Sequence, residues 1–261
     1  MLTIPIQEQT DFSFSRNGTS SVVTCSRQAF TPGTAPQAGY EGNYFMRFNQ
    51  TTAGSTGSYN EIIYRIEDVT TYAGQTATFS FWAKADSSRT LPTPVLNQNF
   101  GSGGSGTVAT NITLNSNALT TAWARYTGTI TVPSISGKTI GTSSFLEIDM
   151  QLFMNTTFTF DTWGWQLEAG SVATAFQTAT GTIQGELAAC QRYYQRKTSV
   201  GNATVFGMGQ ASSTTQAFYS IPIPVSFRVA PSVSHSSAAG WTSSTGSAGG
   251  TIAAFQMSAD S

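Results

Sequence analysis

Short alternations of apolar and polar residues run along most of the chain. In Thr76–Lys84 the apolar Phe79, Phe81 and Ala83 alternate with Ser80, Trp82 and Lys84. Because successive side chains of a β-strand point to opposite faces, this pattern predicts a half-buried strand. Similar patterns cover Gly39–Phe48, Asn60–Val69, Leu91–Leu96, Val108–Leu114, Ala124–Val132, Phe145–Met154 and Phe158–Leu167. The chain is therefore predicted to be all-β, with roughly eight or nine strands before residue 170.

The strand Phe158–Leu167 is expected to carry Phe158 and Phe160 on one face. A strict period of two puts Asp161, Trp163 and Trp165 together on the other face. Gly170 ends the pattern, and a Thr- and Gly-rich turn follows.

A short helix is predicted after this turn, from Ile183 to Arg196. Its apolar face consists of Ile183, Leu187, Cys190 and Tyr194, at spacings of 4, 3 and 4 residues. Leu187, Cys190, Tyr193 and Tyr194 are the residues expected to serve as a connector or a subunit interface.

Four segments follow from these patterns. Residues 1–30 form an N-terminal arm or the first strand, since Leu2, Ile4 and Ile6 alternate with polar or proline positions. Residues 31–180 form the main β domain, and residues 181–197 the connector helix. Residues 198–261 resume strand patterns interrupted by prolines and are expected to form a smaller C-terminal β unit.

Composition narrows the classes of partner. Charged residues make up 10% of the chain and the net charge is −1, which gives no electrostatic case for binding nucleic acid or an anionic membrane. No apolar run reaches the ~20 residues of a membrane helix. The cysteines Cys25 and Cys190 are interpreted as buried free thiols, in keeping with synthesis in a reducing cytoplasm.

Several sequence pieces together resemble bacteriophage virion proteins, namely tail fibres, head fibres and related surface proteins. They are FSFWAKAD at Phe79–Asp86, QNFGSGGSG at Gln98–Gly106, TAWARYTGTITVPSISGKTIG at Thr121–Gly141, WGWQLEAGSVATAF at Trp163–Phe176, ELAACQRYYQRK at Glu186–Lys197, and IPVSFRVAPSV at Ile223–Val233. One departure is Ala175-Phe176-Gln177, where that family more often has Pro-Phe-Glu.

The resemblance implies a jelly-roll β-sandwich similar to carbohydrate-binding modules, followed by the connector helix and the C-terminal β unit. It further implies a non-enzymatic homotrimer on the virion exterior, a tail fibre or adhesin that binds host-surface glycan. The alternative is a capsid decoration or fibre-joining protein that binds other virion subunits.

A polysaccharide depolymerase is the third class. Glu147 and Asp149 lie two residues apart on one predicted strand, so their carboxyl groups are roughly 6–7 Å apart on one face, within the range of glycosidases. The expected alternative is that this face is solvated while Ile148, Met150 and Leu152 face the core. The single histidine, His235, has no acid or nucleophile nearby in sequence, so no catalytic residue is assigned.

Sugar binding needs a flat apolar surface bordered by polar groups. Five tryptophans could provide that surface, and the candidates retained are Trp82, Trp123, Trp163 and Trp165; the fifth is Trp241. In a two-sheet sandwich the competing expectation is that tryptophans lie in the core or in a subunit interface.

A structural calcium ion is the one cofactor that the resemblance leaves open. Related jelly rolls often hold calcium between an early acidic residue and an Asp late in the last strand. Glu41 and Asp161 are similar to those positions, and their oxygens are of the kind that calcium prefers.

Overall fold

The computed structural model describes most of the chain up to residue 197 and short segments beyond it. The described residues are 12–17, 21–54, 59–178, 180, 182–197, 207–211, 213, 217–227, 232, 242–245 and 248–251. The chain divides into two compact units, Met1–Leu187 and Ala188–Ser261. Within the described residues, no helix is long and apolar enough to cross a membrane.

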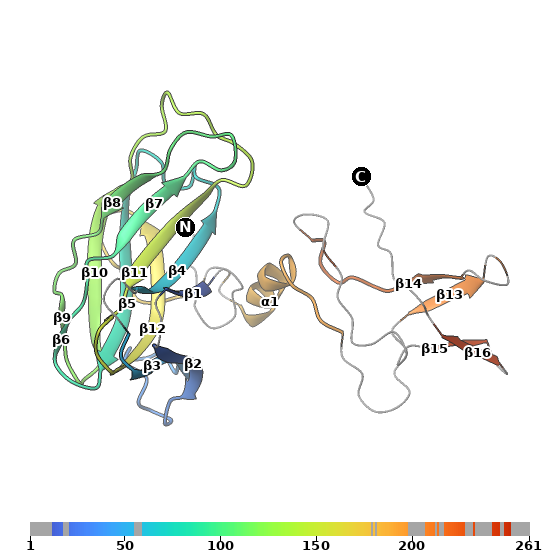
Figure 1. The fold of residues 1–261 in the computed structure, drawn as a ribbon, viewed down its shortest axis with the longest axis horizontal. Helices are drawn as coiled ribbons and strands as arrows, with labels where there is room; N and C mark the ends of the chain where they lie inside the picture. Colours follow the sequence, from blue (N-terminus) through green and yellow to red (C-terminus); the bar gives the residue numbers. More distant parts are fainter. Residues whose placement is uncertain are drawn as a thin grey trace. The chain divides into compact units, whose positions relative to one another are not determined.

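The first unit is a sandwich of two five-stranded antiparallel sheets (Figure 1). Sheet A has the strand order β1-β4-β11-β7-β8, and sheet B the order β10-β5-β12-β3-β2. The strands of sheet A are β1 (Phe12–Asn17), β4 (Tyr59–Glu67), β7 (Val95–Asn99), β8 (Val108–Asn111) and β11 (Phe145–Gln151). Those of sheet B are β2 (Val22–Ala29), β3 (Tyr44–Thr52), β5 (Thr76–Ala85), β10 (Ala124–Thr131) and β12 (Phe158–Ala169). The all-β class expected from the alternation and the β-sandwich that the resemblance implies are both confirmed.

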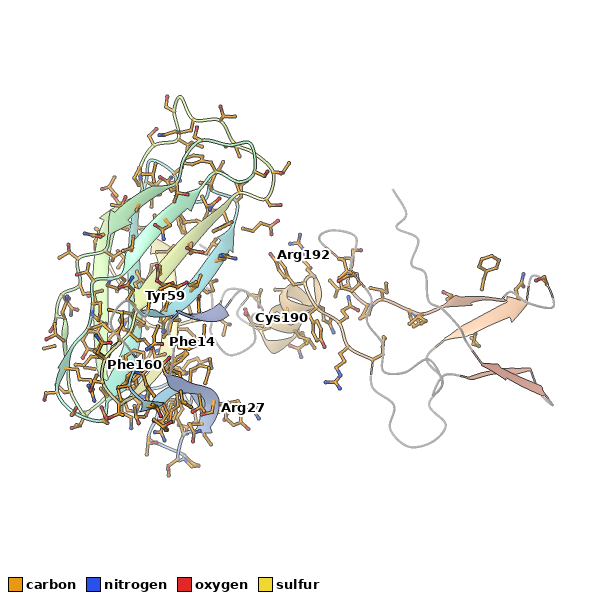
Figure 2. All side chains as sticks on the ribbon, in the orientation of Figure 1. Phe14, Arg27, Tyr59, Phe160, Cys190 and Arg192 are labelled. Atoms are coloured by element: carbon orange, nitrogen blue, oxygen red, sulfur yellow. The ribbon has the colours of Figure 1, made fainter. Side chains whose placement is uncertain are left out.

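The core fills the space between the sheets. Phe79 and Phe81 of β5 and Ile148 and Met150 of β11 are at most 1% exposed, as the alternation predicted. Phe14 of β1 packs against this core, 5.3 Å from Phe48 between ring centres (Figure 2). Because β1 and β2 are the outer strands of the two sheets, the sandwich begins well before residue 31.

The remaining elements are short. β6 (Arg89–Thr90) pairs with β9 (Ala118–Leu119) beside the sandwich, and α1 spans Ile183–Gln191, ending earlier than the predicted Arg196. In the second unit, β13 (Met208–Ala211) pairs with β14 (Ala217–Ser220), and β15 (Thr242–Thr245) with β16 (Ala248–Thr251). His235 and Trp241 lie outside the described residues.

A β-bulge in β12 decides where its tryptophans point. Trp163 pairs with Trp82, but the next pair joins Gln166 to Ser80, so β12 has one residue more than β5 at this point. Gly164, with a φ of 65°, lies inside this bulge. Trp163 therefore faces outward from sheet B while Trp165 faces the core, and the prediction that both share one face is wrong.

Candidate functional site

The structure separates the four candidate tryptophans into two pairs. Trp163 and Trp165 are 1% and 2% exposed, so neither offers a ring face to a sugar, and for these two the predicted contact is corrected. Trp165 packs in the main core, where its indole donates a 2.7 Å hydrogen bond to Thr162. Trp82 and Trp123 are half-buried and remain accessible.

The outer face of sheet B carries what we call the aromatic patch, formed by the half-buried rings of Phe45, Trp82 and Trp123. Phe45 and Trp123 meet edge to face, with ring centres 5.4 Å apart and an interplanar angle of 82°. Phe45 comes from β3, Trp82 from β5, and Trp123 immediately precedes β10. Three segments distant in sequence thus contribute aromatic side chains to one face, where Trp82 is paired with the buried Trp163.

Buried rings pack against the patch. Phe30 lies 4.9 Å from Phe45 and 5.7 Å from Trp123 between ring centres, and Trp163 lies 6.0 Å from Phe30. Trp163 also packs against Phe176 at 4.8 Å. Because these contacts hold the rings in defined orientations, the patch is preorganised for a ligand.

Two loop segments cover Trp163 and keep it from solvent. Gln37 bonds the backbone of Phe176 in both directions, accepting from its N–H at 2.7 Å and donating to its carbonyl at 3.2 Å. Gly42 lies so close that a Cβ there would be 3.2 Å from the Trp163 indole. The loop that contains Gly42 can therefore pack directly onto this ring.

A charged triad borders the patch. Arg47 of β3 binds Asp161 of β12 through two hydrogen bonds, Nε to Oδ1 at 2.7 Å and Nη2 to Oδ2 at 2.8 Å. Lys84 Nζ lies 3.6 Å from Asp161 Oδ2, and the Asp161 side chain is only 3% exposed. The hydrogen bond to Asp161 is the main cause that raises the pKa of the Arg47 guanidinium.

Polar side chains extend the border along the strands. Asn49 of β3 accepts a 3.3 Å hydrogen bond from Thr159 of β12, and both are half-exposed. Ser26 of β2 lies opposite Arg47 in the sheet and is likewise half-exposed. An apolar platform with a hydrogen-bonding rim is the arrangement that a sugar ring requires.

The two residues proposed for calcium do not fit that ion. Both oxygens of Asp161 are bonded by Arg47, and a cation placed there would face the charges of Arg47 and Lys84. Glu41 is exposed and accepts a 2.8 Å hydrogen bond from the Gly33 N–H. Among the described residues, no group of three or more His, Cys, Asp or Glu side chains is arranged to hold a metal ion.

The two carboxylates considered for hydrolysis lie on the outer face of sheet A. Glu147 accepts a 2.7 Å hydrogen bond from Arg65 Nε and one from Asn97 at 3.4 Å. Asp149 Oδ1 is buried and has no hydrogen-bond partner among the described residues. Burial, followed by the charges of Glu61 and Glu147, raises the pKa of Asp149 to about 6.

Two of the four residues expected at a connector or interface are exposed. Leu187 is 49% and Tyr194 is 59% exposed, while Cys190 and Tyr193 are half-buried. Cys25 is an exposed thiol, whereas Cys190 is half-buried. The interpretation of Cys25 as buried is therefore wrong, because it lies on β2 at the edge of sheet B.

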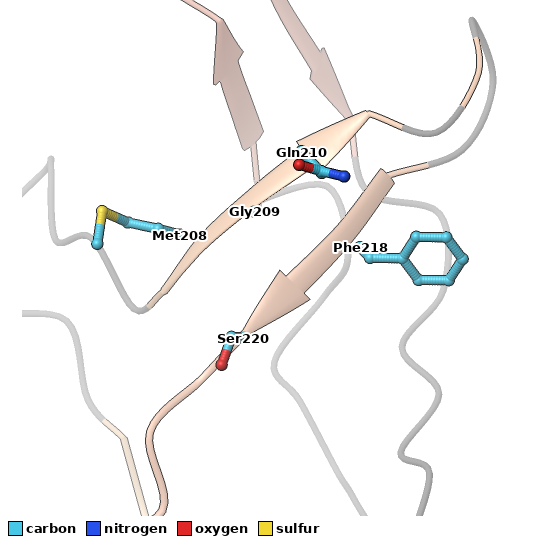
Figure 3. Close-up of a pocket in the computed structure, with 5 residues that line it drawn as sticks. All are labelled: Met208, Gly209, Gln210, Phe218 and Ser220. Carbon is cyan, nitrogen blue, oxygen red and sulfur yellow. The ribbon is translucent and has the colours of Figure 1, made fainter.

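A shallow hollow on the β13–β14 hairpin is a poorer candidate for a site. Its lining consists of Met208, Gly209, Gln210, Phe218 and Ser220 (Figure 3). Met208 and Phe218 are 83% and 62% exposed, and their side chains point away from each other. This lining brings together no charged group and no enclosed apolar surface.

No family model and no curated protein matches the sequence. Among solved structures, the enzymatically active domain of tailspike protein 4 from bacteriophage CBA120 is similar over 62% of this chain and 20% of its own, with a TM-score of 0.40 and 15% identity. The CBM22-1 xylan-binding domain of Paenibacillus barcinonensis Xyn10C is similar over 66% of this chain and 95% of its own, with a TM-score of 0.40 and 14% identity.

The family 11 carbohydrate-binding module of Clostridium thermocellum Lic26A-Cel5E is similar over 67% of this chain and 97% of its own, with a TM-score of 0.40 and 11% identity. The chain thus spans about a fifth of the tailspike structure and nearly the full length of the two modules. The case for a function rests on the site itself.

Proposed function

We propose that this protein binds glycan through the aromatic patch and has no catalytic activity of its own. The observation that carries the proposal is the set of three half-buried rings, Phe45, Trp82 and Trp123, bordered by polar and charged side chains on the outer face of sheet B. The C–H side of a pyranose packs on such rings, and its hydroxyl groups bond the rim.

The sequence resemblance to virion surface proteins supports a biological setting for this activity. In that setting the protein is a tail fibre or adhesin on the phage exterior, and the patch attaches the particle to host-surface glycan. A homotrimer joined to other virion proteins is part of the proposal. A mass in solution three times that of the 27.7 kDa chain is expected, and a monomeric mass at micromolar concentration would contradict it.

A capsid decoration or fibre-joining role is the second candidate, because half-buried apolar rings at the surface equally suit a protein partner. Leu187 and Tyr194, both about half-exposed, offer further apolar surface for such contacts. The third candidate, a polysaccharide depolymerase, would use Glu147 and Asp149, which lie two residues apart on the outer face of β11 and of which Asp149 has a raised pKa. It predicts release of reducing ends that is lost in a Glu147→Gln variant.

The decisive experiment is a glycan array probed with the full chain, followed by affinity measurements on the strongest ligand. Trp123→Ala is expected to weaken binding at least about tenfold, equal to about 1.4 kcal/mol, because it removes a stacking surface. Tyr194→Ala, which removes an exposed aromatic ring outside the sandwich unit, is the matched control and should bind normally.

Melting curves separate a binding defect from an unfolding defect in each variant. Trp163→Ala is unsuitable as a probe of binding, since that ring is buried and its loss would destabilise the sandwich. A Trp123→Ala protein that melts normally and binds the glycan with unchanged affinity would contradict the proposed site.

The same array distinguishes the second candidate function. A chain that binds no glycan on the array but binds phage particles lacking this protein would favour the decoration role.

A further inference from the structure

The position of Lys84 indicates which sugars the aromatic patch would select. Its ammonium nitrogen lies 5.3 Å from the ring centre of Trp123 and 5.9 Å from that of Phe45. The Lys84 side chain is 29% exposed. The ammonium group therefore lies over both rings, on a side chain that is partly open to solvent, so a sugar bound at these rings would be close to a positive charge.

We propose that the aromatic patch selects glycans that carry a carboxylate-bearing sugar, and that Lys84 binds this carboxylate. The proposal rests on the proposed function, since it names the class of glycan bound at the same site. Lys84 thereby becomes the residue that determines specificity, while the rings supply the affinity shared by all sugars.

The hydrogen bonds of the charged triad leave Lys84 available. Arg47 already bonds both oxygens of Asp161 at 2.7 and 2.8 Å. Lys84 is 3.6 Å from the same carboxylate, which is longer than a charge-assisted hydrogen bond. Within the part of the chain that the structure describes, its contacts are this ion pair and the two aromatic rings, so its N–H donors can turn to a ligand.

The local charge also favours an anion. Arg47 and Lys84 together outweigh Asp161 by one positive charge at the border of the patch. Asp86, two residues after Lys84, is paired with Arg89 at 2.9 Å, and Arg125 and Glu168 of sheet B also carry opposite charges, so each of these pairs is neutral overall. A carboxylate bound at Lys84 would therefore neutralise the site rather than add to a negative one.

The outer face of sheet A offers the opposite environment. Three carboxyl groups gather there: burial and then the charges of Glu61 and Glu147 raise the pKa of Asp149. The cation bonded to this group is Arg65, which donates a hydrogen bond to Glu147. An anionic sugar would be repelled from that face. The two faces of the sandwich are thus distinguishable by the charge of the ligand that they accept.

The test compares an acidic polysaccharide with its own carboxyl-reduced form, using the intact full-length chain. A glycan array that contains neutral, uronate-bearing and sialylated glycans identifies the ligand first. For the strongest acidic ligand, carboxyl reduction is expected to weaken binding about tenfold, the effect of losing one partly exposed charge-assisted contact. Lys84→Gln should lose about tenfold toward the acidic form and nothing toward the reduced form.

Two further variants make the result specific. Lys84→Arg keeps the charge and should retain the preference for the acidic form, which shows that charge and not packing is responsible. Lys138→Gln is the matched control, because Lys138 is exposed and lies 5.8 Å over the Phe100 ring, away from the patch. It should bind both forms as the unaltered chain does.

The outcomes distinguish this inference from the proposed function. If the chain binds only neutral glycans, or if Lys84→Gln binds acid and reduced forms with unchanged affinities, the selection by Lys84 is refuted and glycan binding stands. If the chain binds no glycan at all, both proposals fail together. Raising the salt concentration should weaken binding of the acidic form alone, and an equal effect on both forms would also refute the role of Lys84.

Discussion

At the scale of single residues, the carboxyl group of Asp149 shows how one strand position makes the stability of the folded state depend on pH. Its neighbours on β11 and β4 include Glu147 and Glu61, and one of its oxygens is buried without a hydrogen-bond partner among the described residues. Burial and then these two charges raise the pKa to about 6, from an ordinary value of 3.8. The folded state therefore keeps a proton that the unfolded chain has already released.

The expected consequence is a loss of stability as the pH rises from about 4 to about 6, complete above that range. Asp149→Asn removes this penalty and should stabilise the protein by about 1–2 kcal/mol at pH 8, allowing for solvent screening at a half-exposed group, with no gain at pH 4. Urea unfolding of both proteins across this pH range measures the difference. An equal effect at both pH values would contradict the prediction.

Asp86 provides the matched control with the opposite sign. Burial raises the pKa of its carboxyl, but the hydrogen bond from Arg89 and that residue's charge outweigh this effect and lower it overall. Asp86→Asn should therefore cost stability at pH 8 and less in acid. The contrast between the two Asp→Asn variants separates a buried unpaired carboxylate from one paired with an arginine.

At the scale of elements, the bulge in β12 is the feature on which both aromatic layers depend. Gly164 has a φ of 65°, and a Cβ at this position would lie 3.2 Å from Trp82 Cδ1. Gly164→Ala is expected to cost about 2 kcal/mol or more, since it combines left-handed strain with a close contact beneath the aromatic patch. Glycan affinity should fall as well, because Trp82 has to move.

A second glycine separates the two causes of the expected destabilisation, the backbone strain and the contact with Trp82. Gly137 has a φ of 74° but nothing within 4 Å of an added Cβ, so Gly137→Ala carries the strain alone. It should cost about 1 kcal/mol and leave glycan binding unchanged. Equal losses of unfolding free energy in the two variants would show that the contact with Trp82 is unimportant.

At the scale of the whole molecule, the buried core belongs to the first unit. The buried apolar residues of the described chain extend from Phe30 to Phe176, whereas Met208, Phe218 and Ile223 of the second unit are exposed. A two-stranded hairpin such as β13–β14 is marginally stable alone. The sandwich is thus expected to fold without the residues that follow α1.

A fragment of residues 1–191, which ends with α1, provides the test. It should melt within about 3 °C of the main transition of the full chain and bind the same glycan with the same affinity. Calorimetry and the affinity measurement check both points. A fragment that fails to fold, or that folds and loses binding, would show that residues 192–261 contribute to the sandwich or to the site.

The sequence by itself determined the strands and most of their inward and outward faces. Alternation in β5 and β11 correctly separated core residues such as Phe81 and Ile148 from outward ones such as Trp82 and Glu147. The same alternation put Phe45 and Arg47 on one face of β3. That signal could have pointed to the patch had it been combined with Trp82.

Only the tertiary structure decided which tryptophans stay accessible and what their neighbours are. A strict period of two cannot contain a bulge, so it grouped Trp163 with Trp165, while the extra residue at Gly164 sends them to opposite sides of sheet B. One of the two loops that cover Trp163, the loop with Gln37 and Gly42, lies more than 100 positions away in sequence, and so does Arg47, whose guanidinium binds Asp161. Such long-range contacts leave no periodic pattern in the local sequence. Because of them, Asp161, which the sequence offered as a calcium ligand, is bound to Arg47 instead.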